Sequence, residues 1–288
     1  MKTKIQNDHF SIVINHAGAE VSSVKDKQQN EFMWQADASV WPRHAPILFP
    51  IVGKLKDGIY KYNGLPYSLS QHGFARDKQF FVKAEGDDFV VLYLNSDPST
   101  QAVFPFDFEL IVSYALIKNK LIVDYKVMNF GVNAMPFSIG AHPGFRCPIA
   151  SNESLEDYSI VFENKETLKR IHLKDGLLSG DSSDFLIHAS EIKLTPSLFL
   201  SDAIIVQNFT SNFISLVSNK TKHSVKVSIH GFPYLGIWSK PGAEFVCIEP
   251  WFGISDTTNA SGKLEDKNGI QLLAPNQAFT CSFSMEFK

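Results

Sequence analysis

The chain has 288 residues, a length that suits one large domain or two small ones. Its 27 basic and 30 acidic residues give a net charge of −3, which argues against a nucleic-acid binder that works by neutralising phosphates. The three cysteines are widely spaced and form no CxxC pair, so a disulfide scaffold and a structural zinc site are both disfavoured. No apolar run approaches the ~20 residues of a membrane span, and the N-terminus does not resemble a signal peptide. We therefore expect a cytoplasmic protein that binds neither nucleic acid nor a membrane.

Short runs of β-branched and aromatic residues recur along the chain and predict strands. In chain order they lie at residues 10–15, 88–94, 108–129, 213–229, 245–248 and 279–287. The third run is interrupted by Lys118-Asn119-Lys120, which indicates a hairpin, and the fourth repeats that design with a turn near Asn219. Short helices are expected only at 196–200 and 254–263, where no apolar stripe supports them.

The 24 phenylalanines favour two sheets packed face to face, because large aromatic side chains fill the space between such sheets. We predict an all-β protein, a large antiparallel β-sandwich. No Pro/Gly/Ser-rich linker, composition shift or repeat of fixed period divides the chain. Residues 1–288 are therefore expected to form a single domain.

Four segments carry more polar and titratable side chains than a hydrophobic core needs. They lie at 41–54, 71–76, 140–145 and 247–253, and each sets a histidine, arginine or glutamate among glycine, proline and aromatic residues. Only four arginines occur in the chain, and Arg43 and Arg76 lie in these segments. Because lysine is the usual cation elsewhere, these arginines hint at planar, bidentate donation to a ligand, although surface ion pairs would explain them equally well.

His142 and Glu249 each precede a proline, which holds the preceding residue in extended backbone. The pair therefore offers one stiffly held acid–base candidate of each kind, unless both residues merely end two strands.

Other chemistries lack their motifs. The sequence has no GxSxG for a serine nucleophile and no GxGxxG or GxxxxGK[ST] for a nucleotide. A metal held by His72, His142 and Glu249 would lack a close HxH pair, so we predict no metal site. Glycoside hydrolysis would need a second carboxylate opposite Glu249, for which Asp202 or Asp256 is the weaker candidate.

Taken in this order, the segments resemble the aldose 1-epimerase (galactose mutarotase) family, and most of all its LacX-type bacterial branch. The matching stretches span nearly the whole chain and are RHAPILFPIVGKL at 43–55, QHGFAR at 71–76, AHPGF at 141–145, SDAIIV at 201–206 and CIEPWFGISD at 247–256. The resemblance implies a β-sandwich isomerase that interconverts the α and β anomers of a free sugar and needs no cofactor.

The resemblance also implies roles for residues. It places the catalytic acid on His142 and the catalytic base on Glu249. It places a sugar-binding histidine on His72 and a sugar-binding aspartate on Asp202.

The arginine that binds the substrate is less clearly matched. Galactose mutarotases take it from an Asn-Arg-Ile segment, where Lys54 stands nearest in this chain. The hexose-6-phosphate mutarotase branch has arginines that resemble Arg43 and Arg76, so both are expected to bind substrate.

We therefore expect an aldose 1-epimerase that acts on a free aldohexose. A hexose-6-phosphate mutarotase and a non-catalytic carbohydrate-binding module remain alternatives, and the sequence does not decide between a monomer and a homodimer. The acid and the base are expected on opposite sides of the sugar ring, ~5–8 Å apart by analogy with carboxylates that flank a sugar. The aromatic residues near the four segments either stack on sugar faces or belong to the core; they are Trp41, Phe74, Trp238 and Trp251.

Overall fold

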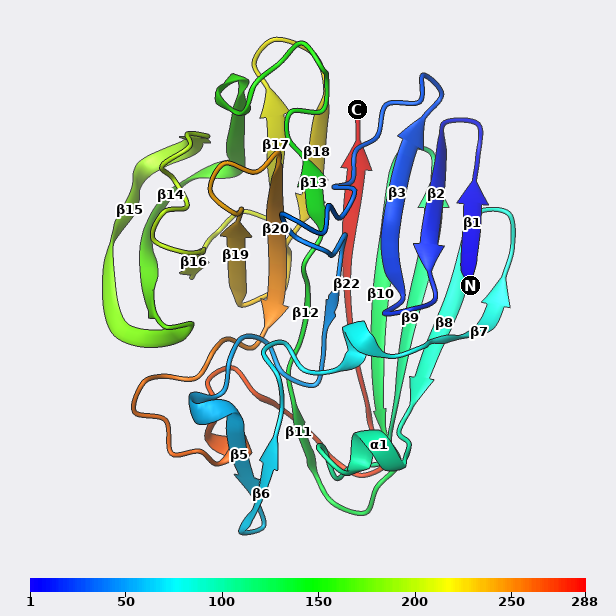
Figure 1. The fold of residues 1–288 in the computed structure, drawn as a ribbon, viewed down its shortest axis with the longest axis vertical. Coiled ribbons are helices and arrows are strands. Elements are labelled where there is room, and N and C mark those ends of the chain that lie inside the picture. Colours follow the sequence, from blue (N-terminus) through cyan, green and yellow to red (C-terminus); the bar gives the residue numbers. More distant parts are fainter.

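The computed structural model describes residues 1–288, and its regular secondary structure consists almost entirely of antiparallel strands (Figure 1). A three-stranded sheet is formed by β1 (Lys2–Gln6), β2 (Phe10–Asn15) and β3 (Glu20–Asp26). Two further sheets have two strands each: the hairpin of β5 (Ile59–Tyr62) with β6 (Leu65–Ser68), and the long-range pair of β11 (Met135–Phe137) with β21 (Gln271–Leu273).

A 15-stranded sheet makes up most of the molecule. Along it lie, in spatial order, β4 (Ile47–Leu48), β12 (Ile139–Ala141), β20 (Phe245–Phe252), β19 (Tyr234–Trp238), β16 (Ile204–Gln207), β14 (Tyr158–Lys174), β17 (Phe213–Ser218), β18 (Ser224–Ser228), β22 (Ala278–Phe287), β10 (Lys120–Asn129), β9 (Phe108–Ile117), β8 (Phe89–Asn95) and β7 (Phe81–Glu85). Off this path, β13 (Gly144–Arg146) pairs with β20, and β15 (Leu177–Lys193) pairs with β14. The predicted all-β antiparallel class is thereby confirmed.

The predicted strands are present in the structure. Residues 10–15 form β2, and residues 108–129 form the β9–β10 hairpin, in which Ile117 pairs with Lys120. The sequence analysis did not single out β14 and β15, which are 17 residues long each. Both strands are largely exposed over much of their length, so their polar sequences lack the apolar alternation that reveals a half-buried strand.

The two predicted short helices are wrong. Residues 196–200 form turns, and residues 254–263 form a loop whose backbone pairs with distant segments, at Thr257 with Leu178 and at Lys263 with Lys61. The one α-helix is α1 (Pro98–Gln101), with 3₁₀ turns at Lys56–Gly58, Ala75–Asp77, Leu155–Asp157 and Leu264–Asp266. Asp97 caps α1 by accepting a hydrogen bond from the Thr100 N–H at 2.8 Å.

One hydrophobic cluster of 64 buried residues runs from Ile5 to Phe287 and includes both ends of the chain. Along β9 and β10 buried residues alternate with partly exposed ones, as expected for strands with one face on a core. Because this cluster draws on nearly every strand, we propose that residues 1–288 form one domain. No helix in the structure has the length and apolar character needed to cross a membrane.

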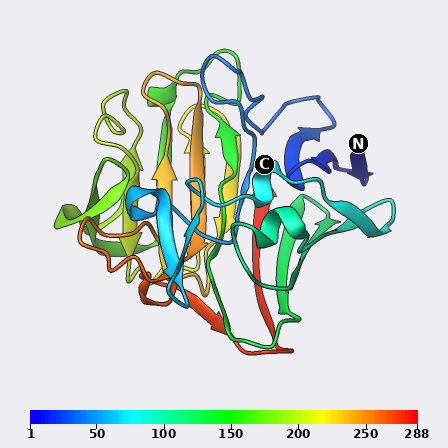
Figure 2. The ribbon, with the colours of Figure 1, turned by 60° about the horizontal axis from the view of Figure 1, so that its bottom comes forward.

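The region that matters for function is the part of the large sheet around β12, β20, β19 and β16. Loops gather on this side of the sheet: the light-blue β5–β6 hairpin and the orange loop after β20 lie next to each other in Figures 1 and 2. Backbone contacts join them, since the Lys61 N–H donates to the Gly262 carbonyl at 2.6 Å. β14 pairs with β16 beside these strands, and β14 and β15 together form a long curved arm on the left of Figure 1.

Candidate active site

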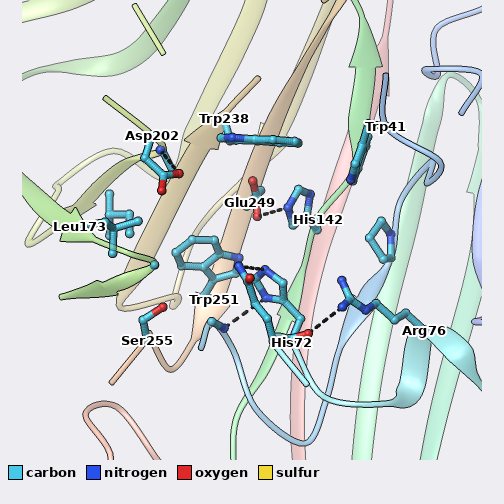
Figure 3. Close-up of a pocket in the computed structure, with 16 residues that line it drawn as sticks. Trp41, His72, Arg76, His142, Leu173, Asp202, Trp238, Glu249, Trp251 and Ser255 are labelled. Carbon is cyan, nitrogen blue, oxygen red and sulfur yellow. Dashed lines mark hydrogen bonds and ion pairs between the residues drawn. The ribbon is translucent and has the colours of Figure 1, made fainter. Parts of the chain in front are cut away.

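A cavity with a volume of about 280 Å³ opens over these strands (Figure 3). Most of its lining comes from the sheet and from the loops that follow strand ends: Trp41, Pro46, Gly53, Gln71, His72, Arg76, His142, Leu173, Gly176, Asp202, Ala203, Ile205, Trp238, Glu249, Trp251 and Ser255. Five of the six residues predicted for the site are among them, and the sixth, Arg43, is not. The size suits a single small ring rather than a long chain, since drug-sized ligands usually occupy pockets of about 300–1,000 Å³.

Sheet register brings His142 and Glu249 together although they lie far apart in the sequence. β12 and β13 both pair with β20, through Gly140 opposite Trp251 and Gly144 opposite Cys247. Continuing this antiparallel register between the two pairs places His142 directly opposite Glu249. Neighbouring residues on one face of such a pair have Cβ atoms about 4.5–5.5 Å apart, so the two side chains must meet.

The imidazole and the carboxylate lie side by side, pointing toward one another in the middle of the pocket (Figure 3). His142 Nε2 is 3.2 Å from Glu249 Oε2, yet the contact lacks the alignment of a hydrogen bond, and Oε2 has no hydrogen-bond partner. The expectation that a sugar ring separates the two groups by ~5–8 Å is therefore wrong. Cross-strand neighbours on one face of a sheet cannot flank a ring from opposite sides.

Three tryptophans surround this pair. Trp41 lies 5.1 Å from the His142 ring between centroids, and Trp238 packs edge-on against the same ring at 5.7 Å. Trp251 lies flat over the sheet because Gly140 and Gly236 carry no side chain there.

A Cβ at Gly236 would come within 2.4 Å of the Trp251 ring, and one at Gly140 within 2.6 Å. The three tryptophans thus line the cavity, whereas Phe74 packs into the main core.

Burial dominates the protonation of the pair. It raises the pKa of Glu249 well above its ordinary value, and the nearby Trp251 indole N–H offsets this only in part. The negative charge of Asp202 raises the same pKa further. Burial lowers the pKa of His142 from 6.5 to about 3. Burial therefore favours an uncharged carboxylic acid on Glu249 beside an uncharged imidazole on His142.

His72 is held by backbone geometry. Its φ angle of +67° is left-handed, which is uncommon for a residue other than glycine, and its Nδ1 accepts a hydrogen bond from the Gly53 N–H at 3.1 Å. Burial first, and then electrostatic interaction with His142 and with Arg76, lowers the pKa of His72 well below 6.5. The ring is neutral and, because Nδ1 accepts a hydrogen bond, its proton lies on Nε2, which is 3.3 Å from the side-chain amide nitrogen of Gln71.

The two predicted arginines occupy different places. Arg76 lines the cavity, and its Nη2 donates to the Gln71 carbonyl at 2.7 Å. Arg43 does not line it: its Nη1 donates to the Arg76 carbonyl at 3.0 Å, and its Nη2 contacts the Asp77 carboxylate. The expectation that Arg43 lines the cavity is therefore wrong. Its guanidinium is occupied by the segment that carries Arg76.

Asp202 lines the opposite side of the cavity and also has a left-handed backbone, with φ at +69°. Its carboxylate accepts a hydrogen bond from the Ala203 N–H at 2.7 Å. Lys54 does not line the cavity; its Nζ donates to the Asp175 carbonyl at 2.9 Å, next to the lining residue Gly176.

Several lining residues were not predicted from the sequence. Leu173 and Gly176 come from the end of the β14–β15 arm, and Ser255 follows β20 and accepts a hydrogen bond from the Lys54 N–H at 3.1 Å. Gln71 precedes His72 in a segment that was singled out, and this adjacency is the one signal that would have found it. Leu173 has no such signal, because the sequence does not tell whether an apolar side chain in a polar strand faces a core or a cavity.

One group of side chains could hold a metal ion. The ligand atoms of His142, Cys247 and Glu249 all lie within 4.8 Å of one another, and all three residues are buried. Burial also raises the pKa of the Cys247 thiol well above its ordinary value. The thiol is therefore protonated, and this donor set favours a soft metal only after losing that proton.

Comparison with known proteins identifies the family of the chain. The family model for aldose 1-epimerase matches residues 1–269. The chain is 32% identical over 285 residues to a protein named LacX from Lactococcus lactis subsp. lactis, covering 96% of this chain and 95% of that protein.

Solved structures show the same relationship. A galactose mutarotase related enzyme from Lactobacillus acidophilus is 40% identical and superposes with a TM-score of 0.96, covering 100% of this chain and 97% of the other. A galactose mutarotase-like protein from Lactobacillus casei is 32% identical with a TM-score of 0.94, covering 100% of both chains. The fold, the family model and these relatives lead to one conclusion: the chain belongs to the aldose 1-epimerase family.

Proposed function

We propose that the protein is an aldose 1-epimerase that interconverts the α and β anomers of a free aldohexose. The observation that carries this proposal is the contact of 3.2 Å between His142 Nε2 and Glu249 Oε2 in a monosaccharide-sized cavity. A pure sugar-binding site needs donors and acceptors, but it has no use for a buried acid and base placed against each other.

The reaction needs two proton transfers at one carbon. Ring opening removes a proton from the anomeric hydroxyl and adds one to the ring oxygen, while the C1–ring-oxygen bond breaks and C1 becomes a carbonyl. Both oxygens are bonded to C1, so they lie next to each other. An acid and a base that lie side by side can therefore serve both oxygens from one edge of the sugar.

The two roles exchange within one cycle. Opening the ring with Glu249 as base and His142 as acid leaves a protonated carboxyl and a neutral imidazole. After rotation about C1–C2, the imidazole takes the proton from the ring hydroxyl and the carboxyl returns one to the carbonyl oxygen. The uncharged pair described above is thus one of the two states through which the cycle passes. No net oxidation or reduction occurs, so the reaction needs no redox cofactor.

We assign sugar binding to the polar residues around the pair. His72 offers a donor at Nε2 and Asp202 an acceptor carboxylate, and Arg76 adds a cation. Trp41, Trp238 and Trp251 offer apolar ring faces against which the C–H faces of a sugar can pack.

A free sugar fits the charge of the cavity better than a sugar phosphate. Arg76 is the one lysine or arginine among the lining residues, and its Nη2 already donates to a backbone carbonyl. Asp202 places a negative charge in the same cavity. A phosphate would face one partly occupied cation and a carboxylate, whereas neutral hydroxyls can use both.

Polarimetry on freshly dissolved α-glucose, α-galactose and their 6-phosphates tests the proposal. We expect the wild type to speed the approach to anomeric equilibrium for a free hexose, while Glu249→Gln is slower by on the order of 10²–10⁴. Acceleration with a 6-phosphate alone would replace the free sugar by the phosphate. A folded wild type that binds sugar but accelerates no aldose or aldose phosphate would establish the binding module instead.

A further inference from the structure

Arg170 is the one arginine that lies outside the four segments singled out in the sequence and their immediate neighbours. It lies on β14, and its Nη2 donates to three successive backbone carbonyls: Ser201 at 2.7 Å, Asp202 at 2.7 Å and Ala203 at 3.2 Å. The left-handed conformation of Asp202 turns the chain sharply, which lets the three carbonyls face one cation.

These hydrogen bonds hold the tip of the turn. Asp202 and Leu200 are exposed, whereas Phe199 before them and Ile204 after them are buried, so packing anchors the two ends of this loop but not its tip. The Asp202 carboxylate makes no ion pair, and its hydrogen bond comes from the adjacent residue, Ala203. The place of the carboxylate therefore depends on the backbone, and the backbone is tied down by Arg170.

The arginine also carries a cost that its contacts must offset. Its Nε–H is buried without a hydrogen-bond partner. The guanidinium is thus oriented so that it binds the three carbonyls, although one of its own N–H donors then has no partner. Such an arrangement is expected where holding the geometry of the turn outweighs the free-energy cost of one unpaired N–H.

We propose that Arg170 is a positioning residue, which fixes the Asp202 carboxylate in the cavity and thereby sets the affinity of the enzyme for its sugar. The inference rests on the proposed function only in that Asp202 accepts hydrogen bonds from sugar hydroxyls. Arg170 does not line the cavity, so it acts through the turn and not by contact with the sugar.

Substitutions at Arg170 test the proposal. Arg170→Met removes all three hydrogen bonds, so we expect KM to rise on the order of 10-fold with kcat nearly unchanged, because the interaction lost is made equally in ground and transition states. Arg170→Lys keeps a cation and should recover part of the loss. Lys169→Met is the matched control: Lys169 is the neighbouring cation on β14, it is exposed, and its loss should leave KM unchanged.

A double-mutant cycle separates positioning from general support of the fold. If Arg170 acts through Asp202, adding Arg170→Met to Asp202→Asn should raise KM little further. Effects on KM that multiply in the double variant would overturn the proposal, and so would a fall in kcat and melting temperature with no change in KM.

A binding measurement keeps this result apart from the question of activity. Three tryptophans line the cavity, so sugar titrations followed by tryptophan fluorescence report affinity even in the Glu249→Gln background. Weaker sugar binding in Arg170→Met, without mutarotase activity in the wild type, would support the positioning role and refute the proposed reaction. Equal binding by wild type and Arg170→Met would refute the positioning role alone.

Discussion

The pocket is built from two regions that are held in different ways. Glu249 projects from β20 and His142 from the two-residue link between β12 and β13; both are buried, and their places follow from the register of β12 and β13 against β20. His72 and Asp202 project from loops, and both have left-handed backbone angles. In a sheet, the backbone hydrogen bonds between strands hold the side chains in position, whereas a residue in a loop is held by the polar contacts of that loop. The strand region is therefore suited to chemistry and the loop region to recognition.

The largest effect should come from the strand region. Glu249→Gln and His142→Asn each remove one proton-transfer group, so we expect kcat to fall by on the order of 10²–10⁴ with KM nearly unchanged. The double variant should be little slower than either single one, because both groups serve one relay. Stopped-flow polarimetry measures these rates, with the exposed Glu244→Gln, just before β20, as the control. A Glu249→Gln enzyme as fast as wild type would remove Glu249 from its role as base.

Changes in the loop region should act on binding. His72→Asn and Asp202→Asn each lose a hydrogen-bonding group for the sugar, so KM should rise on the order of 10-fold, with a smaller fall in kcat than in the strand variants. Asp57→Asn is the matched control, since Asp57 is also exposed and left-handed, at φ +57°, but lies outside the cavity. Loop variants that lose kcat at constant KM would contradict the assignment of chemistry to the strand region and of sugar recognition to the loop region.

The pH dependence of stability sharpens the account of the strand pair. Burial raises the pKa of Glu249 well above its ordinary value of 4.5, which makes stability fall as the pH rises above 4.5, and it lowers the pKa of His142 below its ordinary value of 6.5, which makes stability fall as the pH drops below 6.5. Between pH 4.5 and 6.5 the two slopes have opposite signs and offset each other in wild type. Outside it the pair lowers stability, because at lower pH the unfolded chain binds more protons and at higher pH it binds fewer.

Each single variant removes one of the two titrating groups, so only one of the two pH slopes remains. In Glu249→Gln only His142 titrates, the unfolded chain binds more protons, and the free energy of unfolding should rise between pH 4.5 and 6.5. In His142→Asn only Glu249 titrates, the folded chain binds more protons, and that free energy should fall. Each change should be on the order of 1–2 kcal/mol. Urea unfolding at pH 4.5, 5.5 and 6.5 measures the slopes, and parallel slopes in the two variants would contradict the uncharged pair.

The smallest effect is expected at Arg43. Its ion pair with Asp77 is partly exposed, and such pairs contribute about 0–1 kcal/mol. Arg43→Met should therefore leave kcat and KM within about twofold of wild type. Arg76→Met, which removes a group lining the cavity, should raise KM further than that. Steady-state kinetics of the two variants, side by side, decide which arginine serves the substrate.

The sequence by itself determined the class of the fold and the identity of most candidate site residues. The run at 279–287, in which apolar and polar residues alternate, became β22 because alternation between core and solvent is a local property of the chain. His72, His142 and Glu249 were found because histidine and glutamate among glycine and proline are unusual in a core. The long arm of β14 and β15 was missed, since strands exposed over much of their length show no such alternation.

Only the tertiary structure decided how the site residues meet. The pairing of β12 and β13 with β20 joins segments about a hundred residues apart, and no local pattern encodes a register of that range. That register made His142 and Glu249 direct neighbours instead of groups on opposite sides of a ring. In the structure Arg43 lies outside the cavity, and Arg170 donates hydrogen bonds to the turn at Asp202. A guanidinium can bind several carbonyls or carboxylates, and folding decides which of these groups lie within its reach.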